Sequence, residues 1–180
     1  GGVINGQPET VRCGRSQYFI AEADESDASF LYLNPNIAIV TNIDADHLSS
    51  YSDDFEQLKS SFVNFLNKLP EEGLAIIFLH DPIVRSIKDR LTCRVVTYGE
   101  SADADFRFEH FSQKGLQSTF EAHLEKNKTL SVTLNSIGRH NALNSLAIIA
   151  LADFIGLEKN ALCEALANFP GVGRRFKSHG

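Results

Sequence analysis

The chain has 180 residues, of which 43% are apolar, so it is long enough to bury one core of its own. Its formal charge of -6 comes from interspersed acidic and basic residues without a Lys/Arg cluster, which argues against a nucleic-acid partner. The longest apolar stretches fall far short of the roughly 20 residues of a membrane helix, and no signal peptide is recognisable, so a soluble cytoplasmic protein without membrane contact is expected.

Two short apolar runs open the predicted fold. Residues 18–23 and 37–41 are rich in aromatic and β-branched side chains and are bounded by polar segments, a pattern typical of fully buried parallel strands. Each run ends in a cluster of polar residues. Because ligands of open α/β sheets collect beyond the carboxyl ends of the strands, these two clusters are the first places to look for a site.

An amphipathic helix is predicted after the second run. Between residues 55 and 69, Phe and Leu side chains recur at three- and four-residue spacing, and Asp53 with Glu56 provides a capping box. Further apolar runs at 74–79 and 94–98 flank a short predicted helix. This alternation predicts an α/β fold, with a mostly parallel sheet flanked by helices.

The period of the apolar residues changes to two between residues 105 and 134, where three alternating segments are separated by turn residues. This pattern predicts an antiparallel β meander added to the parallel sheet, and we delimit residues 104–135 as an antiparallel subdomain. Two helices are then expected, over residues 142–154 and around residues 160–169. The first of them is apolar nearly all round and must be buried.

Four carboxylates in six residues follow the first predicted strand, from Glu22 to Asp27. They could hold a hard divalent cation through oxygen ligands, although a charge run of this kind is more often a solvated loop. Glu22 lies inside the apolar run, and an almost buried carboxylate needs a cation or strong hydrogen bonds to stay ionised. Glu22 is therefore the best candidate for a metal ligand in this segment.

Two further polar clusters could contact a ligand. Residues 41–47, after the second predicted strand, offer two carboxylates and the imidazole of His47. Taken alone, a single histidine is more often a structural or surface residue than a ligand. Residues 171–176 combine two glycines with two arginines that could clamp phosphate, which is a weak signal by itself.

A glycine turn leads into the first of the two C-terminal helices and carries His140 and Asn141. A polar first turn of a helix explains these two residues adequately. Asn144 lies one turn further, in otherwise apolar surroundings, and needs partners for its amide if it is buried. An adenine edge, which offers a donor beside an acceptor, would provide them.

Taken in order, four segments of the chain resemble the central, ATP-binding domain of the Mur ligases, and the resemblance runs over essentially the whole chain. They read AEADESDASF (residues 21–30), TNIDADH (41–47), GRHNALN (138–144) and GVGRRF (171–176). This wording is similar to the branch of the family that joins L-alanine to UDP-N-acetylmuramate. The resemblance implies an ATP-dependent ligase of peptidoglycan precursor synthesis, which activates its substrate carboxylate as an acyl phosphate.

The resemblance also assigns roles to individual residues. It implies that Glu22 and His47 each ligate Mg²⁺ and act in catalysis. The residues that it places against ATP are His140, Asn141, Asn144 and Arg175.

Two expectations concern segments beyond these residues. The family's ATP-binding domain begins with a strand and a GxxxxGK[ST] loop that holds the phosphates, and no such loop occurs in this sequence, which contains no Met and opens on Gly1. We therefore expect residues 1–180 to be a partial central domain without its first strand and phosphate-binding loop. The N-terminal and C-terminal domains of the same chain are expected to be missing too, and the piece to be inactive alone.

Three alternatives stay open at this point. The murein tripeptide recycling ligase typically carries Tyr at the position of Ser26, and a folylpolyglutamate-type ligase would share ATP and magnesium but differ in its acceptor. A non-catalytic α/β binding module that lost its phosphate loop would need neither. A phosphate loop encoded shortly before Gly1 would favour a ligase over the binding module.

Overall fold

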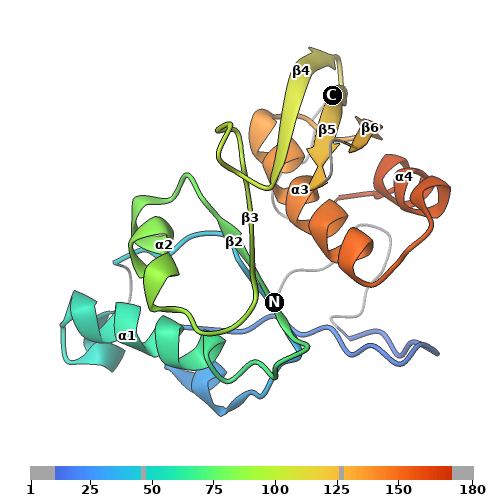
Figure 1. Cartoon of the computed structure of the whole chain (residues 1–180). Helices are drawn as coiled ribbons and strands as arrows, with labels where there is room; N and C mark the ends of the chain where they lie inside the picture. Colours follow the sequence, from blue (N-terminus) through green and yellow to red (C-terminus); the bar gives the residue numbers. More distant parts are fainter. Residues whose placement is uncertain (1–10, 46–47, 126–127, 172–180) are drawn as a thin grey trace, which may run out of the picture.

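The computed structural model describes residues 11–45, 48–125 and 128–171. The strands of this part form one sheet in the order β1-β2-β3-β4-β5-β6 (Figure 1). They are β1 (Ile37–Val40), β2 (Leu74–Phe78), β3 (Val95–Gly99), β4 (Phe106–Lys114), β5 (Gln117–Leu124) and β6 (Lys128–Leu134). The helices are α1 (Phe55–Leu66), α2 (Pro82–Ile87), α3 (Arg139–Phe154) and α4 (Lys159–Ala167). Short 3₁₀ turns are η1 (Ser29–Tyr32), η2 (Leu48–Tyr51) and η3 (Lys88–Arg90).

Strand direction divides the sheet into two parts. Strands β1 to β4 pair in parallel, whereas β4, β5 and β6 pair antiparallel. The predicted α/β fold, a mostly parallel sheet flanked by helices with an added antiparallel meander, is therefore confirmed. The delimitation of residues 104–135 as a subdomain stays a prediction, and in the structure β4 continues the same sheet.

The meander projects beyond the carboxyl ends of the parallel strands. A full parallel crossover needs a dozen or more residues, yet only residues 100–105 separate β3 from β4. This short connection is sufficient because β4 overlaps β3 by two residue pairs, Tyr98 with Phe106 and Gly99 with Arg107. Most of β4 therefore runs past the end of β3, and the meander forms a wall beside this edge of the sheet (Figure 1).

The two faces of the sheet bury two separate apolar clusters. Along β2, Leu74 and Ile76 pack on the side of α3, whereas Ala75 and Ile77 pack on the side of α1 and α2. This follows from the alternation of side chains along a strand that is covered on both faces, which is why the run reads as continuously apolar. Both layers of helices are therefore anchored by the same short strand.

Helix α3 lies across the strands and begins at Arg139, before the predicted start at residue 142. It contacts β2, β3, β4 and β5 and also packs against α4, which explains apolar residues on more than one of its sides. The predicted burial of this helix is confirmed for most of its apolar side chains, and Leu146 is fully buried. Among the helices in the described ranges, none is long and apolar enough to cross a membrane.

The strand predicted at residues 18–23 is wrong, because this segment has no strand assignment. Tyr18, Phe19 and Ile20 are 48%, 92% and 87% exposed, respectively. A buried parallel strand needs a hydrogen-bonded neighbour and a cover on both faces. Among the described residues the sheet ends at β1, and neither condition is met for this segment.

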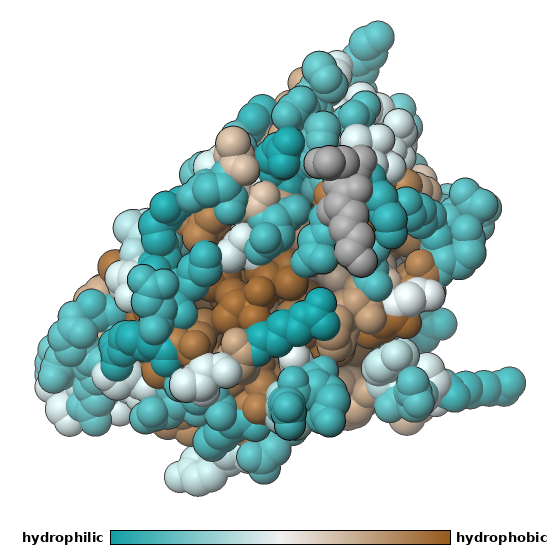
Figure 2. Space-filling model, in the orientation of Figure 1, coloured by the Kyte–Doolittle hydropathy of each residue, from teal (hydrophilic) through white to brown (hydrophobic). Residues whose placement is uncertain are grey.

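Apolar surface is also present at the β1 edge of the sheet. Ile39 of β1 pairs in register with Ile76 and is 38% exposed, although Ile76 is fully buried under α3. Figure 2 shows apolar side chains gathered in the middle of the face viewed in Figure 1, where β2 and β3 lie, with polar side chains around them. Within the described part, β1 is therefore covered less completely than β2.

Helix α1 confirms the predicted amphipathic helix but is capped one residue later than predicted. The carboxylate of Asp54, not that of Asp53, accepts hydrogen bonds from the backbone N–H groups of Glu56 at 2.8 Å and Gln57 at 3.4 Å. Asp53 has φ 57°, in the left-handed region, whereas an N-cap residue needs the extended backbone that Asp54 has. The sequence pattern located the helix but not its capping residue.

Replacing Asp54 by Ala is expected to lower the free energy of unfolding by about 0.5–2 kcal/mol, because two N–H groups of the first turn lose their acceptor. Asp53→Asn is the matched control and should change it by less than about 0.5 kcal/mol, since Asn tolerates the left-handed backbone. Urea unfolding of the purified chain followed by circular dichroism measures both values. Equal losses in the two variants would contradict the assignment of Asp54 as the cap.

Candidate functional site

The carboxyl ends of β1, β2 and β3 lie at one edge of the sheet, because these strands are parallel. Thr41, Leu79 and Glu100 follow the three strands there, and the residues beside them form what we call the carboxyl edge. Open α/β sheets bind their ligands at this edge. Two groups of polar residues occupy it, one beyond β1 and one beyond β2 and β3.

The acidic segment, residues 22–27, is tied to the turn that follows β1. The hydroxyl of Tyr51 in η2 donates a hydrogen bond to the carbonyl of Glu25, and that of Ser50 donates to the carbonyl of Ser26 at 2.6 Å. Burial raises the pKa of Tyr51, which keeps its hydroxyl protonated and able to donate. The acidic segment is therefore held against η2, the 3₁₀ turn that follows the second predicted metal-binding segment in the chain.

The end of the acidic segment is fixed by aromatic packing. Phe30 in η1 is buried, and its ring centroid lies 5.1 Å from that of Phe62 and 5.0 Å from that of Phe65 in α1. Just before it, the hydroxyl and backbone N–H of Ser29 hold the pKa of Asp27 below its usual value. The segment therefore has an anchored end and a charged, accessible body.

Glu22 is exposed, so the expectation of an almost buried carboxylate is wrong. The reason is the one given for residues 18–23, which do not form the buried strand that would enclose it. His47 lies outside the described residues, as does Arg175. Within the described part, no group of three or more His, Cys, Asp and Glu residues converges as a metal site. Mg²⁺ keeps several waters and needs only one or two carboxylates, so the exposed Glu22 suits it as a ligand.

The first turn of α3 begins with a close approach between a glycine and a histidine. Gly138 has φ 94°, a backbone conformation that residues with a Cβ atom rarely adopt, and a Cβ atom there would lie 2.5 Å from Cε1 of His140 unless that ring moved, so glycine is favoured. The side-chain amide of Asn141 donates to the carbonyl of Ile137 at 2.7 Å. Asn141 therefore stabilises the turn with one of its two amide hydrogens, which leaves its second amide hydrogen and its carbonyl oxygen for other contacts.

His140 and Asn144 are both exposed on α3. They are four residues apart, which places them next to each other on one face of the helix. Asn144 was expected to need a ligand only if its side-chain amide were buried. Because the side chain is exposed, it does not need one. Its exposure instead leaves both amide groups accessible to a ligand beside the helix.

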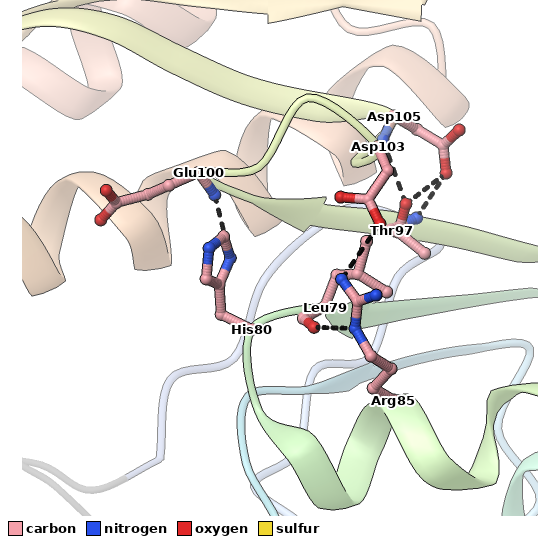
Figure 3. A network of polar contacts seen from close by, with 7 residues as sticks. All are labelled: Leu79, His80, Arg85, Thr97, Glu100, Asp103 and Asp105. Carbon is pink, nitrogen blue, oxygen red and sulfur yellow. Dashed lines mark hydrogen bonds and ion pairs between the residues drawn. The ribbon is translucent and has the colours of Figure 1, made fainter.

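The second group at the carboxyl edge contains residues that the sequence reasoning missed. Arg139 forms an ion pair with Glu100, and the backbone N–H of Glu100 donates to Nδ1 of His80 at 3.2 Å (Figure 3). Glu100 directly follows β3, and His80 follows β2 by two residues. Ligands of open α/β sheets collect beyond the carboxyl ends of the strands. Inspection of the residues after the third and fourth predicted strands would therefore have found His80 and Glu100.

The loop between β3 and β4 is held by its own polar contacts (Figure 3). The buried hydroxyl of Thr97 donates to the carboxylate of Asp105 at 2.6 Å, and the backbone N–H of Asp105 donates back at 3.0 Å. Arg85 of α2 donates to the carbonyl of Leu79 at 3.2 Å and to Asp103 at 3.0 Å. These contacts hold the loop between β3 and β4 against α2.

A cavity of about 340 Å³ lies at the other edge of the sheet. Its lining includes Asn36, Ile37 and Gly73, at the amino ends of β1 and β2. Ligands of this class of fold bind beyond the carboxyl ends, so the size of this cavity does not make it the site. The polar residues of the carboxyl edge are the better candidate.

The fold is that of an α/β domain with a mostly parallel sheet, and its candidate site lies at the carboxyl edge. The family described as the Mur ligase middle domain matches residues 8–152. The chain belongs to this family.

Named relatives come from the same family. The chain is 49% identical to a UDP-N-acetylmuramate–L-alanine ligase of Coxiella burnetii (strain Dugway 5J108-111) over 181 aligned residues, which cover 100% of this chain and 39% of that protein. A crystal structure of the UDP-N-acetylmuramate-alanine ligase of Thermotoga maritima has a TM-score of 0.74 and 30% identity, covering 86% of this chain and 34% of the other. The UDP-N-acetylmuramate:L-alanyl-gamma-D-glutamyl-meso-diaminopimelate ligase of Neisseria meningitides has a TM-score of 0.71 and 27% identity, covering 85% and 48%.

Proposed function

We propose that the chain is part of an ATP-dependent ligase that joins L-alanine to UDP-N-acetylmuramate, in the cytoplasm, during peptidoglycan precursor synthesis. The observation that carries this proposal is the 49% identity over the whole chain with a ligase of that name. The chain spans 39% of that relative, so the remaining domains of the parent protein would bind the UDP moiety and present the amino acid.

The chemistry of the reaction explains why ATP is required. A carboxylate oxygen is a very poor leaving group, so the lactyl carboxylate of UDP-N-acetylmuramate first takes the γ-phosphoryl group of ATP, which gives an acyl phosphate and ADP. The amino group of L-alanine then attacks the acyl carbon, and phosphate leaves as the amide bond forms. Magnesium, when bound, would neutralise charge on the transferring phosphoryl group.

The residues of the carboxyl edge fit this reaction. Glu22 would offer an exposed carboxylate to the cation, and His47 would be a second ligand. The contacts of Glu25 and Ser26 with η2 support a fixed position for the acidic segment beside the carboxyl edge. His140 and Asn144 form an exposed polar face on α3 that suits the donor and acceptor edge of adenine. Asn141 would support this face, and Arg175 would contact the phosphates.

Phosphate release by the full-length protein tests the proposal. With ATP, Mg²⁺ and UDP-N-acetylmuramate present, we expect release to depend on added L-alanine. The matched comparison replaces L-alanine with L-alanyl-γ-D-glutamyl-diaminopimelate. Release with the tripeptide alone would move the assignment to the recycling ligase, which the structure of the Neisseria meningitides relative keeps as the second candidate. No release with either nucleophile would contradict a ligase and favour a non-catalytic binding module.

A further inference from the structure

Arg139, the first residue of α3, is held by Glu100 through two parallel hydrogen bonds. Its Nε donates to Oε1 of Glu100 at 2.9 Å, and its Nη2 donates to Oε2 at 2.6 Å. Arg139 holds the pKa of Glu100 below its usual value, so both groups are charged at neutral pH. A pair with this forked geometry fixes direction as well as distance, unlike a single contact between flexible side chains.

Aromatic rings hold the same guanidinium from another direction. Its central carbon lies 4.9 Å from the ring centroid of Phe108 and 5.5 Å from that of Phe111. Phe108 is buried in the core under α3, so the Arg139 side chain rests on a fixed surface of β4. An exposed ion pair usually contributes little to stability, but here the two rings also restrict the Arg139 side chain.

The pair connects the start of α3 to neighbouring elements of the carboxyl edge. The backbone N–H of Glu100 donates to His80 beyond β2, so Glu100 is itself anchored (Figure 3). The backbone N–H of Gly138 donates to the side chain of Gln113 in β4 at 3.0 Å. The first turn of α3 is therefore tied to the ends of β2 and β3 and to the meander.

Helix stability alone does not account for Arg139 at this position. The N-terminus of a helix carries a partial positive charge, so a cation in the first turn is unfavourable there and a carboxylate would be favourable. Glu100 supplies the carboxylate from another part of the chain, and it also sets the direction of the turn. The next residue is His140, whose ring packs back over Gly138.

We propose that the Glu100–Arg139 pair is a positioning device, which orients the first turn of α3 so that His140 and Asn144 face a bound adenine nucleotide. This inference rests on the proposed function and adds to it two residues that contact no reacting atom. Its consequence is that weakening the pair should impair nucleotide binding more than it impairs folding.

The test uses Glu100→Gln and Arg139→Lys in the full-length protein. Arg90→Lys is the control, because it weakens the hydrogen bond of 3.0 Å from Arg90 in η3 to Ser60 in α1, which lies outside the carboxyl edge. Calorimetric titration gives the Kd of ADP, steady-state kinetics give KM for ATP and L-alanine, and thermal unfolding gives Tm. We expect the Kd of ADP and the KM of ATP to rise about tenfold in the two test variants, as for one lost charged hydrogen bond, with KM for L-alanine unchanged. The control should bind ADP as the wild type does.

Three results would overturn the inference. If the wild type binds ADP and both test variants bind it with the same Kd, this inference alone is overturned. If the Kd of ADP rises equally in the test and control variants along with an equal loss of Tm, the pair is merely structural and the inference is overturned too. A wild-type protein that binds no adenine nucleotide would overturn the proposed function and this inference with it.

Discussion

Replacement of Glu22 by Gln in the full-length protein is expected to reduce turnover by about 100-fold or more, the usual loss when a preorganised charge contact to the transferring group is removed. Gln keeps the size of the side chain but lacks the charge that makes a carboxylate a good ligand for Mg²⁺. Because Glu22 is exposed, the melting temperature should change by less than about 4 °C. Phosphate release at saturating substrates, repeated over a range of Mg²⁺ concentrations, measures the effect.

Glu25→Gln provides the matched control for this prediction. Glu25 is an exposed carboxylate of the same segment, but its contact with Tyr51 is made by its backbone carbonyl, which the substitution leaves in place. Its turnover should stay close to that of the wild type. Equal losses of turnover in Glu22→Gln and Glu25→Gln would indicate that the acidic segment acts only through its total charge. A fall of tens of degrees in the melting temperature of Glu22→Gln would make Glu22 structural.

The buried strands of the sheet were predictable from their apolar composition. The runs that became β1 and β2 are continuously apolar, and β3 is mostly apolar with one polar residue, Thr97. The meander shows the period of two expected for strands with one covered face. Residues 18–23 have a similar composition but form no strand. Strand formation depends on a neighbouring backbone, and a single run of sequence contains no information about which neighbour is in place.

Proximity of candidate residues was predictable where they lie close together in the sequence. His140 and Asn144 are four residues apart on α3, and the structure places both on the same exposed face. The Glu100–Arg139 pair was missed because it joins residues 39 positions apart. Only the register of β4 against β3 and the packing of α3 bring them together, and neither is visible in the residues themselves.

Leu146→Ala is expected to lower the free energy of unfolding by about 2–5 kcal/mol, which is the range for removing a fully buried leucine side chain. Leu146 is 0% exposed and belongs to the cluster that α3 forms with the sheet. Ile148, on the same helix, is 43% exposed and serves as the matched control. Ile148→Ala should cost about 1 kcal/mol or less, because less apolar surface returns to water. Urea unfolding of the purified chain gives both values.

The comparison of Leu146→Ala with Ile148→Ala tests which side of α3 packs on the sheet. The sequence does not indicate this side, because the helix is apolar nearly all round. An unequal loss of stability in the two variants would identify it. Equal losses would contradict the packing of α3 described above. Since the first turn of this helix carries His140, Leu146→Ala should also weaken ADP binding in the full-length protein, whereas Ile148→Ala should not. We therefore expect the candidate site to depend on core packing in the middle of α3 as well as on the ion pair at its first residue.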